Sequence, residues 1–308
     1  MHIIEAIPGH QARVFSLEYP LVPTSIYPSQ LAQIAKAYEY LLTVTSADNI
    51  ILVGDSAGAA LQLSLLFHIA RPCPNVSPPS KSLPVPKAVV LLSPWCHTDS
   101  THNGTCRLTG SIDEDFLTTE MLNEYARLYS GASPSKPPPP LWYPLQFWWE
   151  ASKRCYRQFT QGNYTTKWLN IAKSSLDEVP YLDTKELARH SEKCKSPYIN
   201  PFASLAKEHE AWLSAALPSN ILIIYGLKEM MAGDISEFAR GLEKVINSRG
   251  SGKVEVMTRW KKGWHVWPLV LMYLGQDTRE AESGVNLIAE YISRVIGIDG
   301  ISNEKRRE

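Results

Sequence analysis

The chain has 308 residues, of which 44% are apolar, so it is long enough to bury a substantial core. Its 31 lysines and arginines balance its 31 aspartates and glutamates, which excludes the strong basic charge typical of nucleic-acid binding and of binding to acidic membranes. Five scattered cysteines form no CxxC pair, so neither a disulfide framework nor a metal site is predicted. A small neutral partner is therefore expected.

Strand and helix signals alternate along the first part of the chain. Short apolar runs predict strands, and apolar residues three and four positions apart predict helices. A proline-punctuated loop at 20–30 separates the first predicted strand from the first helix. In chain order, these elements are a strand at 12–19 (ARVFSLEY), a helix at 31–42, a buried strand at 49–54, a helix at 57–69, a strand at 87–93 and a helix at 118–129.

The same alternation returns in the last third of the chain. It predicts a strand at 220–226, a helix at 234–246, a strand at 253–259 and a closing helix at 284–296. Strands that alternate with helices favour an α/β fold, in which a mostly parallel sheet is covered by helices on both faces.

The segment 134–195 interrupts this alternation with a polyproline-like spacer followed by many aromatic residues. We interpret it as an inserted cap between two parts of one core, 1–133 and 196–308. Its aromatic residues can form the core of a small subdomain, or they can offer a lipophilic wall to a substrate. Those considered for the second role are Trp142, Phe147, Trp148 and Trp149.

The pentapeptide Gly54-Asp55-Ser56-Ala57-Gly58 lies between a predicted strand and a predicted helix. In this context a G-x-S-x-G run forms a sharp turn that exposes the serine hydroxyl at the carboxyl edge of the sheet. The helix that follows directs its N-terminal amides toward the same place. An ordinary tight turn is the alternative, but the flanking elements favour Ser56 as a nucleophile.

A nucleophilic serine needs a base and an acid that orients the base, and both follow the serine in this arrangement. His265 lies in a loop between a predicted strand and an apolar helix, where Trp264 and Trp267 would limit the access of water. Glu229 is the first carboxylate after the strand at 220–226, and Asp234 is the second. We favour Glu229 as the acid. The other histidines of this part of the chain lie in polar stretches and are expected to be solvated: His97, His102, His190 and His209.

These motifs together resemble the hormone-sensitive lipase branch of the α/β-hydrolases, and the fungal steryl acetyl hydrolase-like members in particular. GDSAG resembles the signature of that branch. The runs EYPLVPTSIYPSQ, LLSPW with Trp95, SPYINPFAS, YGLKEMMAGD and GWHVWPL resemble its other conserved stretches. The resemblance covers most of 14–132 and 196–296. His97 departs from it, because the family tends to have aspartate there.

The resemblance implies a carboxylic-ester hydrolase with a Ser56, His265 and Glu229 triad and no metal or organic cofactor. The substrate would be a lipophilic ester such as a sterol acetate, or a polyketide or terpenoid ester of fungal secondary metabolism. Trp95, Trp264 and Trp267 are further candidates for its pocket. A non-catalytic binding or scaffolding protein and an acyl-transfer enzyme remain alternatives.

The His-Gly-Gly-Gly motif that supplies oxyanion donors in this family is missing upstream of Ser56, so Ala57 is the one recognisable donor. We interpret the chain as truncated at its start, which would leave an exposed sheet edge at 12–19. No signal peptide or membrane-spanning segment is predicted, which favours a cytoplasmic location. The endoplasmic reticulum is the alternative if an upstream segment exists.

Overall fold

The computed structural model describes residues 12–79, 81–98, 115, 117, 119–131, 190, 192–259, 263–273 and 278–297. Most of the predicted cap insertion at 134–195 lies outside these residues. The same holds for its four pocket candidates Trp142, Phe147, Trp148 and Trp149.

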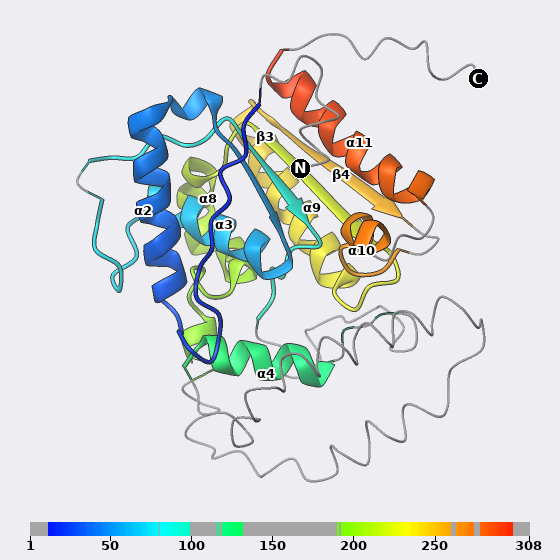
Figure 1. Ribbon diagram of the computed structural model, residues 1–308. Coiled ribbons are helices and arrows are strands. Elements are labelled where there is room, and N and C mark those ends of the chain that lie inside the picture. The colour runs from blue at the N-terminus through cyan, green and yellow to red at the C-terminus, as the bar shows by residue number, and fades with distance from the viewer. Residues whose placement is uncertain are drawn as a thin grey trace.

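The centre of the fold is a four-stranded parallel sheet with the strand order β1-β2-β3-β4 (Figure 1). Its strands are β1 (Ile51–Asp55), β2 (Ala88–Leu92), β3 (Asn220–Gly226) and β4 (Lys253–Arg259). Since all four strands run in the same direction, their carboxyl ends meet at one edge of the sheet. The predicted parallel sheet is confirmed.

The two central strands consist almost entirely of apolar residues because both of their faces are covered. Side chains alternate between the faces, so Val89 and Ile223 join one core cluster while Val90 and Ile224 join the other. The first cluster is covered by α3 (Ser56–Ala70), α8 (Glu210–Ala216) and α9 (Ala232–Arg249). The second is covered by α10 (Trp267–Tyr273) and α11 (Thr278–Val295).

The helix α3 is buried nearly all round because it packs between the sheet and two other helices. One of these is α8, and the other is α2 (Ser29–Val44), which forms an outer layer (Figure 1). The helix α4 (Thr119–Tyr129) lies on the side toward which the strands point (Figure 1). Three short 3₁₀ turns complete the described structure, at Ala47–Asn49, Pro201–Leu205 and Lys207–His209.

The predicted strand at 12–19 is wrong, because this segment is irregular. A strand requires a neighbouring strand for its hydrogen bonds, and none of the described strands pairs with this segment. Instead, the ring of Phe15 packs on Tyr40 of α2, with 6.1 Å between the ring centroids. Within the described residues, β1 is one of the two edge strands of the sheet, and its Val53 is 41% exposed. The prediction that this strand is buried is therefore also wrong.

None of the helices in the described part of the chain combines the length and the apolar character needed to cross a bilayer.

Candidate active site

Ser56 lies at the sharp turn where β1 ends and α3 begins. Its φ is 49°, a left-handed value that is unfavourable for a residue with a side chain. The turn also brings Gly54 close to the first turn of α3. A Cβ atom on Gly54 would lie 2.8 Å from the carbonyl carbon of Gly58 and 2.9 Å from the nitrogen of Ala59, so only glycine fits there. This geometry is that of a nucleophile elbow.

The remaining residues of GDSAG frame the elbow. The N–H of Ala57 belongs to the first turn of α3, whose amides have no acceptor within the helix, and Ala57 itself is exposed. Asp55 ends β1 and is also exposed. The nearest atom to a Cβ placed on Gly58 would be the hydroxyl oxygen of Tyr19, at 3.8 Å, so this position has room for a side chain.

Glu229 lies in the turn between β3 and α9, and its side chain is fully buried. Its Oε2 atom accepts a hydrogen bond from the hydroxyl of Ser93 at 2.6 Å and one from the N–H of Gly226 at 3.4 Å. The same oxygen lies 3.7 Å from Nδ1 of His265. Asp234, the other predicted acid, lies in α9 and pairs with a different histidine. The structure thus brings Glu229, and not Asp234, to His265.

His265 lies between β4 and α10 and is 3% exposed. Its backbone N–H donates to Oδ1 of Asp115 at 3.3 Å, while Oδ2 of Asp115 accepts from the N–H of Met230 at 2.8 Å. One buried carboxylate thus joins two loops: the histidine loop, which carries His265 and leads into α10, and the acid loop, 227–231, which carries Glu229. The N–H of Lys228 strengthens this junction by donating to the carbonyl oxygen of Gly263 at 3.0 Å.

Burial and charge shift the pKa values of this pair. Burial raises the pKa of Glu229, and the charge of Asp115 adds to the increase, although the nearby His265 and the hydrogen bond from Ser93 oppose it. Burial acts to lower the pKa of His265, but the pKa is raised because the nearby carboxylate of Glu229 and the charges of Asp115 and Asp55 outweigh burial. The pair therefore holds a proton more tightly than isolated side chains would.

Three residues near the site were missed in the sequence. Ser93 follows β2 at the carboxyl edge of the sheet, and its position at the end of a parallel strand was the available signal. Tyr19 lies beside the elbow, and burial and the charge of Asp55 raise the pKa of its hydroxyl. Asp115 had no signal, because its contacts join segments more than 100 residues away.

The predicted pocket tryptophans differ in how much surface they offer. Trp95 is 8% exposed and Trp267 is 2% exposed, and they belong to the core clusters on opposite faces of the sheet. Both therefore contribute mainly core area, which leaves little surface for a substrate. Trp264 is half-buried beside His265 and keeps an accessible part.

The expectation of solvated histidines is wrong for His97 and His190. The ring of His97 stacks on Phe202 with 4.7 Å between ring centroids, and its Nδ1 atom lies 3.5 Å from Oδ1 of Asp234. His190 is 2% exposed, and its Nδ1 atom lies 2.8 Å from the hydroxyl oxygen of Ser130. Polar neighbours in the sequence do not reveal burial by segments that are distant along the chain.

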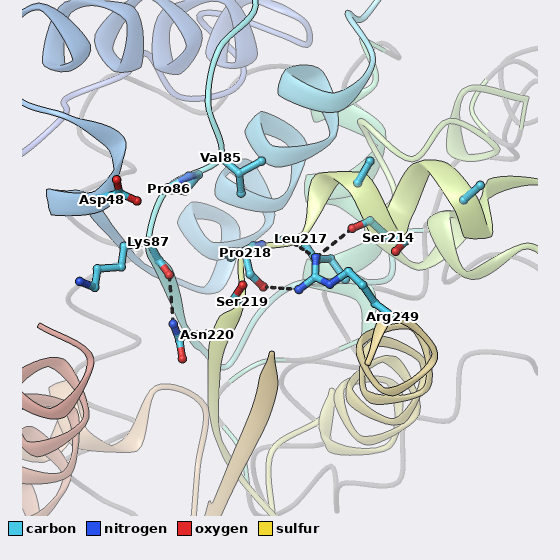
Figure 2. A pocket seen from close by; sticks show the side chains of 12 residues that line it. Asp48, Val85, Pro86, Lys87, Ser214, Leu217, Pro218, Ser219, Asn220 and Arg249 are labelled. Atoms are coloured by element: carbon cyan, nitrogen blue, oxygen red, sulfur yellow. Dashed lines mark hydrogen bonds between the residues drawn. The ribbon is translucent and has the colours of Figure 1, made fainter. Parts of the chain in front are cut away.

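A cavity of about 640 Å³ lies at the opposite edge of the sheet, beside the first residues of β2 and β3 (Figure 2). None of the residues lining it belongs to the elbow, the acid loop or the histidine loop. Arg249 lines it and donates to the carbonyl oxygens of Ser214 and Leu217 at 3.1 and 2.9 Å, at the end of α8. This arginine thus stabilises a helix terminus. We place the chemistry at the buried glutamate and histidine instead.

The described residues contain no group of three or more histidine, cysteine, aspartate or glutamate side chains that could hold a metal ion. The site combines a nucleophile elbow at the end of β1 with a buried histidine and carboxylate pair, and both lie at the carboxyl edge of the sheet.

Comparison with known proteins points to one fold family. Residues 5–154 match the family described as alpha/beta hydrolase fold. Steryl acetyl hydrolase 1 of Saccharomyces cerevisiae is 26% identical over 110 residues, which are 35% of this chain and 24% of that protein. The putative steryl acetyl hydrolase mug81 of Schizosaccharomyces pombe is 30% identical over 118 residues, 38% of this chain and 29% of that protein. The matched stretches thus span less than a third of both relatives.

Solved structures with the same fold cover nearly the whole chain. A hormone-sensitive lipase from a metagenome library superposes with a TM-score of 0.53 at 22% identity, covering 91% of this chain and 65% of that one. The structure of EstE5 superposes with a TM-score of 0.56 at 18% identity, covering 96% of this chain and 69% of that one. At these identities the likeness establishes the fold.

Proposed function

Because the chain is a hormone-sensitive-lipase-like α/β-hydrolase in fold, we propose that it hydrolyses carboxylic esters with Ser56 as nucleophile, His265 as base and Glu229 as orienting acid. The observation that carries this proposal is the buried pairing of Glu229 with His265 at the sheet edge where the elbow lies. The residues after β2 connect the parts of this edge. The N–H of Trp95 donates to the carbonyl of Ser56, and the hydroxyl of Ser93 accepts from the histidine loop.

We propose the following reaction for this site. Nδ1 of His265 faces Glu229, which leaves Nε2 to remove the proton of the Ser56 hydroxyl as its oxygen attacks the ester carbonyl. The protonated imidazole then gives its proton to the departing alcohol. A water molecule, deprotonated by the same nitrogen, then attacks the acyl group on Ser56. The bond from the acyl group to the Ser56 oxygen breaks, the acid leaves, and the imidazole returns its proton to that oxygen. The N–H of Ala57 donates a hydrogen bond to the oxyanion in both steps.

We propose a lipophilic ester as the substrate, such as a sterol acetate or a polyketide or terpenoid ester of fungal secondary metabolism. Two curated relatives are named as steryl acetyl hydrolases, which supports an acetate ester of an apolar alcohol. The aromatic residues of the segment 134–195 would cover the apolar part of the substrate as a cap.

The test uses p-nitrophenyl esters and a fluorophosphonate probe on wild-type protein, Ser56→Ala and Ser251→Ala. Ser251 is exposed in the turn before β4, at the opposite edge of the sheet, so it is a matched control. We expect hydrolysis and covalent labelling for wild type and Ser251→Ala, and neither for Ser56→Ala. Equal activity in Ser56→Ala would remove Ser56 from the mechanism. A folded wild-type protein that the probe does not label would favour a binding or scaffolding role.

A further inference from the structure

Ser93 connects the acid loop to the histidine loop through a single hydroxyl group. It directly follows β2, is 1% exposed, and has a left-handed φ of 42°. Its hydroxyl donates to Oε2 of Glu229 at 2.6 Å and accepts the N–H of Val266 at 2.9 Å. Its own N–H donates to the carbonyl of Ile224 in β3 at 2.6 Å, which holds its backbone in place.

We propose that Ser93 is a positioning residue for the ester hydrolysis proposed above: its hydroxyl orients the Glu229 carboxylate and fixes the loop that carries His265. This inference rests on the proposed function, since it assigns Glu229 and His265 the roles given there. Ser93 itself does not touch the substrate in this role.

The direction of the hydrogen bond follows from the contacts of the hydroxyl. Its oxygen accepts the N–H of Val266, and its single hydrogen is therefore directed toward Glu229. A hydroxyl that accepts one hydrogen bond becomes a stronger donor in another. The contact with Val266, the residue after His265, thus strengthens the bond that orients the acid.

The need for such a donor follows from the burial of Glu229. Its Oε1 atom has no hydrogen-bond partner among the described residues, so Oε2 carries the contacts that fix the carboxylate. A buried carboxylate is unfavourable unless it is hydrogen-bonded. Losing the Ser93 hydroxyl would therefore disfavour the ionised form of Glu229 and leave its orientation less fixed. The distance of 3.7 Å from Nδ1 of His265 leaves the pair sensitive to this loss.

The effect on proton binding has a definite direction. The hydrogen bond from Ser93 lowers the pKa of Glu229 and opposes burial. The charged groups that act on the pair are Asp115, which acts on both members, and Asp55, which acts on His265. Removing the hydroxyl leaves these charges in place and favours proton uptake by the pair. The acid limb of the kcat/KM profile should therefore move to higher pH.

The experiment compares Ser93→Ala and Ser93→Gly in the wild-type and Glu229→Gln backgrounds, with kcat, KM and the pH profile as readouts. Both variants lack the hydroxyl, and glycine also accommodates the positive φ, so it separates the hydroxyl from backbone strain. We expect kcat to fall about 10-fold with little change in KM, and the acid limb to move to higher pH. In the Glu229→Gln background, removing the Ser93 hydroxyl should lower kcat by a further factor of less than about two, because the effect of Ser93 acts through Glu229.

An unchanged kcat and pH profile in the folded Ser93 variants would overturn the positioning role, as would an equal loss in the wild-type and Glu229→Gln backgrounds. Neither result affects the proposed function, which depends on Ser56. Loss of activity and of fluorophosphonate labelling in Ser56→Ala would show that Ser56 is the nucleophile, whatever Ser93 does.

Discussion

A Cβ atom placed on Gly226 would lie 1.8 Å from the carbonyl oxygen of Gly263. Gly226 ends β3 immediately before the acid loop, and Gly263 precedes His265 in the histidine loop. The backbones of the two loops therefore lie in direct contact, and this contact requires the absence of a side chain at position 226. The spacing between Glu229 and His265 depends on it.

We expect Gly226→Ala to lower the free energy of unfolding by about 3 kcal/mol, because the clash is with backbone atoms that cannot rotate away. Gly58→Ala is the matched control. A Cβ there meets no atom closer than 3.8 Å, and alanine favours the helix, so stability should stay the same or rise by up to about 1 kcal/mol. Denaturant unfolding of both variants measures the difference. Equal stability would show that the two loops can separate at little cost.

Glu229→Gln and Asp234→Asn distinguish the two possible acids. We expect Glu229→Gln to lower kcat by about 10³- to 10⁴-fold, since the neutral amide cannot stabilise the protonated imidazole of His265. Asp234→Asn should keep kcat near the wild-type value, because Asp234 pairs with His97. Steady-state kinetics on a p-nitrophenyl ester provide the comparison. A large loss in Asp234→Asn together with a small one in Glu229→Gln would exchange their roles.

The pH dependence of kcat/KM should reflect the raised pKa of His265. The imidazole must be neutral to act as base, so activity is lost as the pH falls through its pKa, and the acid limb should lie above the ordinary value of 6.5. In Glu229→Gln the residual activity should have its acid limb at lower pH, because burial then acts on His265 with the main opposing cause removed. Identical profiles for the two proteins would contradict this coupling.

Ser56→Gly should be more stable than Ser56→Ala by about 1 kcal/mol, and neither variant should hydrolyse esters. The φ of 49° at this position is unfavourable for alanine and costs little for glycine. Thermal or denaturant unfolding of the two variants isolates the backbone strain, since both lack the hydroxyl. If alanine were the more stable of the two, the elbow would store no strain at Ser56.

The same substitution should cost more stability in a central strand of the sheet than in the edge strand β1. Val90 in β2 is fully buried, so Val90→Ala should lower the free energy of unfolding by about 2 kcal/mol. Val53 in the edge strand β1 is 41% exposed, and Val53→Ala should cost less than about 1 kcal/mol. Urea titrations of this pair, which share the same chemical change, measure the contrast. Similar losses would mean that β1 is covered in solution.

Most helices and strands were predictable from the sequence because their signals are local. The apolar run at 220–226 and the helical spacing at 284–296 persist whatever surrounds them, and both are seen as predicted in β3 and within α11. The run at 12–19 failed for the opposite reason. Its pattern suits a strand, but a strand exists only if another strand lies beside it.

The sequence by itself determined the alternation of strands and helices, the elbow around Ser56 and a short set of possible partners for it. These follow from periodicity and from residue types that occupy neighbouring positions in the chain. Only the tertiary structure placed Glu229 rather than Asp234 beside His265, buried His97 and His190, and brought Ser93 and Asp115 between the two loops. These contacts join residues tens to more than one hundred positions apart, and their distances depend on how the parallel strands align their ends.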